Sequence, residues 1–193
     1  VHTNRAFNQT FEVRGATADV IAPTPGGTIG VDEINNLGYI EVRFQGTSDA
    51  AIDESTIDGD EIILRDSEGN LVAIAAIPSR VGESNIYRYA ILDTLVVGAY
   101  EVEIVVGSFT DTALTPNANL VEIETFTVGQ ATATLADPLP GDVIDREALN
   151  ERGYIDVEFI PVAGAEVDHG SITDDGQEFT LTGADGQNVG ILG

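Results

Sequence analysis

The sequence predicts an all-β fold made of tandem Ig-like, seven-stranded β-sandwich modules, one complete and two partial. Two observations carry this prediction. The chain repeats itself at a spacing of 115 residues. Short segments of alternating apolar and polar residues, rich in β-branched and aromatic side chains, recur between clusters of turn residues, without a helix-length pattern. Repeats of this kind predict a string of similar structural units.

The internal repeat is clearest where residues 16–44 align with residues 131–159 without a gap. Thirteen of these 29 positions are identical, and many of them are Gly, Pro or aromatic residues. At the same shift, Asp53 aligns with Asp168. Two extra residues in the second copy then bring Glu61 over Glu178. One common register over so many structurally restrictive residues indicates a duplicated module.

The repeat defines three segments. Residues 1–15 are expected to hold the last strand of a preceding module, residues 16–130 a complete module, and residues 131–193 the first half of a following module. Because both ends fall inside modules, we expect the chain to be part of a longer tandem array.

Seven strands are predicted in the complete module. They cover residues 16–21, 38–44, 61–65, 71–78, 85–91, 99–106 and 121–128, with a possible helical turn at 32–36. Seven short strands in about 115 residues are typical of an antiparallel sandwich. The alternation in 38–44, 99–106 and 121–128 predicts core. Tyr87 and Tyr89 share one strand face, which is either an exposed aromatic patch or part of the core wall.

A local motif supports the Ig-like topology. Residues 95–102 contain Gly98 and Tyr100 at the start of the penultimate strand. In Ig-like sandwiches a tyrosine at this place turns its hydroxyl back onto the preceding loop, an arrangement called the tyrosine corner. We therefore expect the Tyr100 hydroxyl to bind the backbone of the loop before it.

Composition excludes several classes of function. The 193 residues include 33 Asp and Glu but only eight basic residues, all Arg, so the formal net charge is −25. Such a chain lacks the basic surface of a nucleic-acid binder. It has no Cys, which excludes thiolate metal sites and disulfides. No apolar run approaches 18 residues, so no membrane insertion is predicted.

The sequence also argues against an enzyme. A nucleophile needs a base and a group that orients the base. His2 and His169 are the only histidines, and His169 aligns with Glu54 in the repeat. We expect both to be solvated loop residues. Carboxylate pairs are plentiful, but no aromatic cleft accompanies them.

The complete module resembles a known family. The ordered features are Pro23-x-Pro25-Gly26-Gly27, the strand 38–44, the segment Asp53-x-x-Thr56-Ile57, the turn Asp66-x-x-Gly69 and the tyrosine motif. Together they are similar to the bacterial Ig-like modules of S-layer proteins and large repetitive surface adhesins. The resemblance implies an extracellular or cell-surface location and a role as stalk, extender, lattice or filament subunit. The resemblance therefore supports the fold, but for function it indicates only a broad class.

Calcium is the metal that this composition favours, because Ca²⁺ takes six to eight oxygen ligands, mostly from carboxylates and carbonyls in loops. The candidate ligands are Asp53, Asp58, Asp60, Asp111, Asp168, Asp174 and Asp175. Sandwich topology should gather the first four at the pole where the chain enters the module. Asp53 and Asp168 are favoured because the repeat retains them.

A calcium ion at the junction between modules is a second hypothesis. The pole where the chain leaves residues 16–130 should carry acids that face Asp168, Asp174 and Asp175 of the next copy, and a cation would relieve their repulsion. The alternative is that Asp simply suits turns, or that the acidic surface holds hydration. No EF-hand or nonapeptide calcium motif is present.

These observations predict a structural or adhesive repeat segment. The partners expected are neighbouring modules of the same or adjacent chains, with a cell-surface or glycan ligand as a further candidate. Alternatives are a glycan- or ligand-binding sandwich, or an accessory domain of a secreted hydrolase. Partial modules could also be completed by strands of neighbouring chains in filaments.

Overall fold

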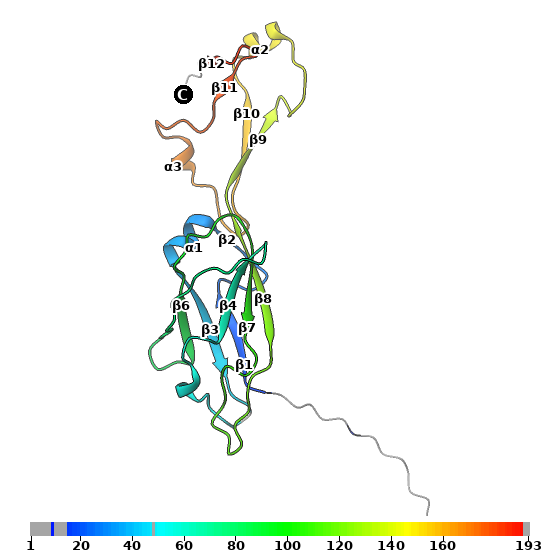
Figure 1. The fold of residues 1–193 in the computed structure, drawn as a ribbon. Helices are drawn as coiled ribbons and strands as arrows, with labels where there is room; N and C mark the ends of the chain where they lie inside the picture. The colour runs from blue at the N-terminus through cyan, green and yellow to red at the C-terminus, as the bar shows by residue number, and fades with distance from the viewer. Residues whose placement is uncertain (1–8, 10–14, 48, 191–193) are drawn as a thin grey trace, which may run out of the picture. The chain divides into compact units, whose positions relative to one another are not determined.

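The computed structural model describes residues 9, 15–47 and 49–190, and the chain divides into two compact units, Val1–Gln130 and Ala131–Gly193 (Figure 1). We call them unit 1 and unit 2 and describe each by itself. The strand predicted within residues 1–15, and His2 with it, lies almost wholly outside the described residues.

Unit 1 is a sandwich of two four-stranded sheets. The first sheet has the order β1 (Thr17–Ala22), β3 (Tyr39–Gln45), β6 (Ile86–Ala90) and β5 (Ser79–Arg80). The second has the order β2 (Thr28–Gly30), β8 (Glu122–Gly129), β7 (Gly98–Ile104) and β4 (Ile62–Asp66). Neighbouring strands are antiparallel except β2 and β8, which are parallel. The all-β sandwich prediction is confirmed.

Two short helical segments connect strands of unit 1. Helix α1 (Val31–Leu37) follows β2, and its one buried residue is Ile34. It ends at Gly38, whose φ of 71° is the left-handed conformation that glycine adopts readily. The 3₁₀ turn η1 (Glu54–Thr56) lies between β3 and β4. Helix α1 confirms the helical turn predicted at 32–36.

The predicted strand at 71–78 is wrong. This segment makes only isolated bridges, Arg65 with Leu71 and Ile74 with Ile91. Its backbone bonds first to β4, from the Val72 N–H to the Leu64 carbonyl, and then to the Ala90 carbonyl of β6. It crosses from one sheet to the other, so its unbroken apolar run does not alternate between two faces. The short β2 strand was not predicted.

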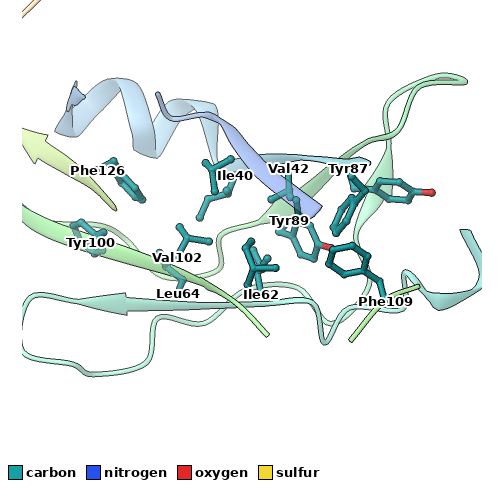
Figure 2. Packing of buried hydrophobic residues seen from close by; sticks show 14 of the residues in the cluster. Ile40, Val42, Ile62, Leu64, Tyr87, Tyr89, Tyr100, Val102, Phe109 and Phe126 are labelled. Atoms are coloured by element: carbon teal, nitrogen blue, oxygen red, sulfur yellow. The ribbon is translucent and has the colours of Figure 1, made fainter. Parts of the chain in front are cut away.

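The core of unit 1 lies between the two sheets (Figure 2). Eight of its members come from strands predicted as core: Ile40, Val42 and Phe44 of β3, Tyr100, Val102 and Ile104 of β7, and Phe126 and Val128 of β8. Tyr87 and Tyr89 are buried, so they belong to the core wall and not to an exposed patch. Aromatic edge-to-face contacts join Phe44 to Tyr87 and to Phe109.

The tyrosine corner is confirmed. The Tyr100 hydroxyl donates to the Val96 carbonyl at 2.9 Å and accepts from the Val96 N–H at 3.0 Å. Its ring stacks on Phe126 at 5.4 Å between centroids. These contacts anchor the loop before β7 to the second sheet.

Unit 2 repeats the first half of unit 1. Its elements are β9 (Thr132–Asp137), α2 (Arg146–Arg152), β10 (Asp156–Ile160), α3 (His169–Ile172), β11 (Leu181–Thr182) and β12 (Asn188–Val189). Thr132 pairs with Ile160 as Thr17 pairs with Gln45, and both strand pairs carry a register shift at the same place. Helix α2 ends at Gly153, the counterpart of Gly38, with a φ of 75°.

No described residue of unit 2 is buried. Leu135 is 37% exposed, whereas its counterpart Val20 in unit 1 is 3% exposed. The difference follows from topology, because the described part of unit 2 has no counterparts of β7 and β8, two strands of the second sheet that cover this face in unit 1. Among the described residues, no helix is long and apolar enough to cross a bilayer.

Candidate functional site

Three carboxylates form the acidic cluster of unit 1, which we define as Asp58, Asp60 and Glu61. One ligand oxygen from each lies within 4.8 Å of the others, and no other such group of three occurs among the described residues. The cluster sits where the chain enters β4. Gly59 separates the two aspartates with a φ of 110°, and a Cβ there would overlap the carbonyl oxygen of Ala76. Only glycine therefore allows this tight turn.

Glu61 is the buried member of the acidic cluster, with no exposed surface. Its carboxylate accepts hydrogen bonds from the Asp58 N–H at 2.5 Å, the Gly59 N–H at 3.0 Å and the Tyr89 hydroxyl at 2.7 Å. Burial, followed by the bond to Glu61, raises the pKa of Tyr89, so this hydroxyl stays protonated and donating. Glu61 thus ties the turn before β4 to strand β6 of the opposite sheet.

Asp58 and Asp60 are exposed and face solvent beside Glu61. Partial burial, and then the like charges of Asp58 and Glu61, raise the pKa of Asp60. Crowded carboxylates of this kind are relieved either by a proton or by a cation. The exposed oxygens of Asp58 and Asp60 are accessible to a metal, whereas the Glu61 carboxylate already accepts hydrogen bonds from groups of the protein.

Asp53 and Asp168 have a structural role that explains why the repeat retains them. Asp53 precedes η1 and accepts hydrogen bonds from the N–H and the hydroxyl of Ser55 at 3.1 and 2.6 Å. Asp168 precedes α3 and accepts from the Gly170 N–H at 2.9 Å. Side-chain caps of this kind satisfy backbone donors at the start of a helical turn. Neither residue belongs to the acidic cluster.

Asp111 is buried and fully engaged inside unit 1. One oxygen accepts from the N–H and hydroxyl of Thr47, at 3.1 and 2.5 Å, and the other from the backbone N–H groups of Ala113 and Asn117. These bonds, led by the Thr47 hydroxyl, lower the pKa of Asp111 far below its usual range. Asp111 clamps the segment after β7 to the end of β3, away from the role of an open ligand.

Asp174 and Asp175 lie in the loop of unit 2 that corresponds to the acidic cluster. Both are exposed, and Asp174 accepts from the Gly176 N–H at 2.6 Å. Glu178 occupies the position of Glu61. The loop therefore keeps three acids, although the counterpart of Tyr89 is absent from the described part of unit 2.

Of the predicted ligands, the structure brings together only Asp58 and Asp60. Sequence reasoning missed Glu61, which completes the group. Its signal was the repeat itself, which aligns Glu61 with Glu178 at the start of a strand whose next residue is apolar. A glutamate retained at the edge of a buried strand indicates a carboxylate with partners in the fold.

A shallow hollow of about 260 Å³ lies on the outer side of the second sheet, with Arg65, Glu101 and Tyr100 among its lining residues. The Tyr100 hydroxyl is already committed to the tyrosine corner, and its ring stacks on Phe126. This aromatic is therefore not a free platform for a sugar. His169 lies in α3 and is exposed.

No known protein-family model and no curated protein sequence matches this chain.

Proposed function

We propose that this chain is a load-bearing segment of tandem Ig-like modules, a spacer, stalk or filament subunit of a secreted or cell-surface bacterial protein. The observation that carries the proposal is the parallel pairing of β2 with β8 in unit 1. Residues 28–30 pair in register with residues 127–129. The Gly26 N–H donates to Thr125 at 2.7 Å, and the Thr127 N–H to Gly27 at 2.9 Å.

This pairing joins the entering and leaving parts of the module. Tension applied along the chain pulls β2 and β8 in opposite directions along their common axis. The hydrogen bonds between the strands lie across that axis and are loaded together instead of one after another. The repeated register of unit 2 supports the idea that such modules follow one another in series.

The mechanical proposal predicts that resistance depends on the direction of pulling. The chain has no cysteine, so handles can be attached through Thr17→Cys with Gln130→Cys, both at exposed positions. Single-molecule force spectroscopy should then show unit 1 unfolding at high force in one step. The reason is that the β2–β8 pair and the β1–β3 pair are sheared as wholes.

A matched control uses the same fold and chemistry with handles at Val106→Cys and Leu120→Cys. These exposed residues follow β7 and precede β8. Pulling there opens the antiparallel β7–β8 pair bond by bond, so the unfolding force should be several-fold lower. Equal forces in the two directions would contradict a load-bearing role.

We further propose that Ca²⁺ binds at the acidic cluster and stiffens unit 1. Asp58 and Asp60 offer exposed carboxylate oxygens beside a turn that Glu61 holds in place, and oxygen ligands from loops suit this ion. The corresponding loop of unit 2, with Asp174, Asp175 and Glu178, supports a recurring site. A calcium ion between successive modules stays a prediction.

Calcium should raise the melting temperature of unit 1, measured by calorimetry with EDTA as the reference. At a free concentration about 100 times the Kd, binding stabilises by about 2.7 kcal/mol, a rise of roughly 10 °C. The double variant Asp58→Asn/Asp60→Asn should lose this response. The control Asp32→Asn/Glu33→Gln, which removes an equal charge at α1, should keep it. If calcium raised the melting temperature of both double variants equally, the effect would be general screening of negative charge, and the proposed site would be contradicted.

A further inference from the structure

Two glutamates point to the core side of β8. Glu122 pairs directly with Ile104 of β7, and Glu124 with Val102. Opposite residues of an antiparallel pair share one face of the sheet, and both β7 residues are buried. The inward positions of β8 therefore begin with Glu122 and Glu124 before its apolar residues follow.

Glu124 bridges the two sheets. The backbone N–H of Val20, in β1 of the first sheet, donates to Oε1 of Glu124 in the second sheet at 3.3 Å. The other oxygen, Oε2, is buried and has no hydrogen-bond partner among the residues that the structure describes. A carboxylate oxygen taken out of water without a donor destabilises the charged form of the group.

The charged groups that face Glu124 are all acidic. They are Asp19 on β1 and Glu122 on β8, while β7 presents Val102 at this position. Burial has the largest effect and raises the pKa of Glu124; the bond from the Val20 N–H acts in the opposite direction, and the charges of Asp19 and Glu122 raise the pKa further. Burial and Asp19 raise that of Glu122. No described ion pair reaches either glutamate.

We propose that Glu124 is a proton-dependent latch that holds the edge strand β1 to β8. With a proton on Glu124, the side chain spans the two sheets without a buried charge. The loss of that proton leaves a buried carboxylate beside Asp19 and Glu122. The contact between β1 and β8, which we call the β1–β8 seam, then becomes less stable. Opening of the latch frees the outer edge of β1, the first described strand of unit 1.

The direction of the pH effect follows from linkage. Because folding raises the pKa of Glu124, the stabilising contribution is complete below the unfolded value of about 4.3 and is lost as the pH rises through the folded value. Each unit of difference between the two values corresponds to about a tenfold change in the opening equilibrium. The seam is therefore tightest in mild acid and loosest near neutrality.

Amide hydrogen exchange of Val20 in the full chain tests the latch, with the core amide of Val42 as internal reference. In the wild type, opening at Val20 should increase as the pH rises from mild acid to neutrality, after correction for intrinsic exchange. Glu124→Gln keeps a carbonyl acceptor for the Val20 N–H and removes the charge. Its opening should be independent of pH and equal to that of the acid form of the wild type.

Two further variants make the test specific. Asp19→Asn should reduce the pH dependence at Val20, because it removes one of the facing charges. Glu101→Gln, on the outer face of β7, should leave it unchanged. The latch is overturned if Glu124→Gln shows the wild-type pH profile, or if it loosens Val20 at every pH, since Glu124 would then be only a structural acceptor. These outcomes do not depend on pulling forces or on calcium, so they are separable from the proposed function.

Discussion

Single carboxylates of unit 1 differ in what surrounds them, although they look alike in the sequence. Glu61 and Asp111 are both fully buried and surrounded by donors, whereas Asp58 and Asp60 are exposed. Glu124 is a third kind, half-buried with one oxygen that lacks a donor. The same side-chain chemistry is therefore a clamp at Glu61 and Asp111, and its partners elsewhere motivate the proposed ion site and the proposed proton-sensitive contact.

Asp111 carries an acid-stability prediction. Its folded pKa is lowered by Thr47 and Asn117, so its contribution is present above the unfolded value of about 3.9 and is lost as the pH falls through the folded value. Asp111→Asn places an amide among backbone donors. We expect a lower urea midpoint near neutrality, and a difference from wild type that shrinks in strong acid. Asp32→Asn, at an exposed position of α1, should match the wild type throughout. If the urea midpoint of the variant were lower by the same amount at every pH, the loss would come from altered packing and not from the charge of Asp111.

Elements are joined by a few side chains that act across long sequence distances. Asn35 of α1 donates to the Leu95 carbonyl at 2.9 Å and accepts from the Leu95 N–H at 2.9 Å. It also donates to the Val31 carbonyl within its own helix. The Asn35 side-chain amide thus bonds both backbone groups of Leu95, as a neighbouring strand would. These bonds hold the segment that leads into the tyrosine corner. The exposed Asn150 holds the same position in α2.

This pair of asparagines supplies a matched mutational test. Asn35→Ala removes two hydrogen bonds to Leu95 and should lower the free energy of unfolding of unit 1 by about 1–3 kcal/mol. Asn150→Ala should leave it unchanged, because no described hydrogen bond of the Asn150 side chain exists. Chemical denaturation followed by a signal from unit 1 measures both. Because alanine favours a helix more than asparagine does, propensity predicts no loss; an unchanged Asn35→Ala variant, or an equal loss in Asn150→Ala, would contradict a stabilising contact with Leu95.

At the scale of the whole molecule, the described residues of unit 2 correspond to the first half of unit 1, and one contact of that half differs between the units. In unit 1, Arg88 of β6 lies over the Tyr39 ring at 4.3 Å and pairs with Glu41 at 2.7 Å. In unit 2 the equivalent ring and carboxylate, those of Tyr154 and Asp156, take Arg152 of α2 instead.

That substitution keeps the geometry. The Arg152 guanidinium lies 4.4 Å from the Tyr154 ring centroid and 3.0 Å from the Asp156 carboxylate. The contacts of the first-half strands in unit 2 are made by residues close in sequence, whereas in unit 1 the apolar face is buried by strands far along the sequence. The load-bearing prediction belongs to this scale, because it depends on both ends of unit 1 being paired.

Much of the fold was predictable because the signals are local and repeated. Alternation located β3, β7 and the end of β8, and the motif around Tyr100 located the corner. The segment 71–78 was misassigned because an apolar run does not show that a chain changes sheets. At the start of β8 the alternation is reversed: Ile123 is apolar but faces outward, and Glu124 is polar but faces inward. Only the pairing with β7 shows which of the two faces the core.

The sequence by itself determined the β-rich class, the repeat and its register, and the concentration of acids, because these depend on residue order and composition. Only the tertiary structure decided which acids meet. The acidic cluster depends on how the turn at Gly59 packs, and Asp111 and Glu124 depend on strands more than 60 residues away. Contacts between distant segments are set by the packing of both sheets, and no local pattern encodes them.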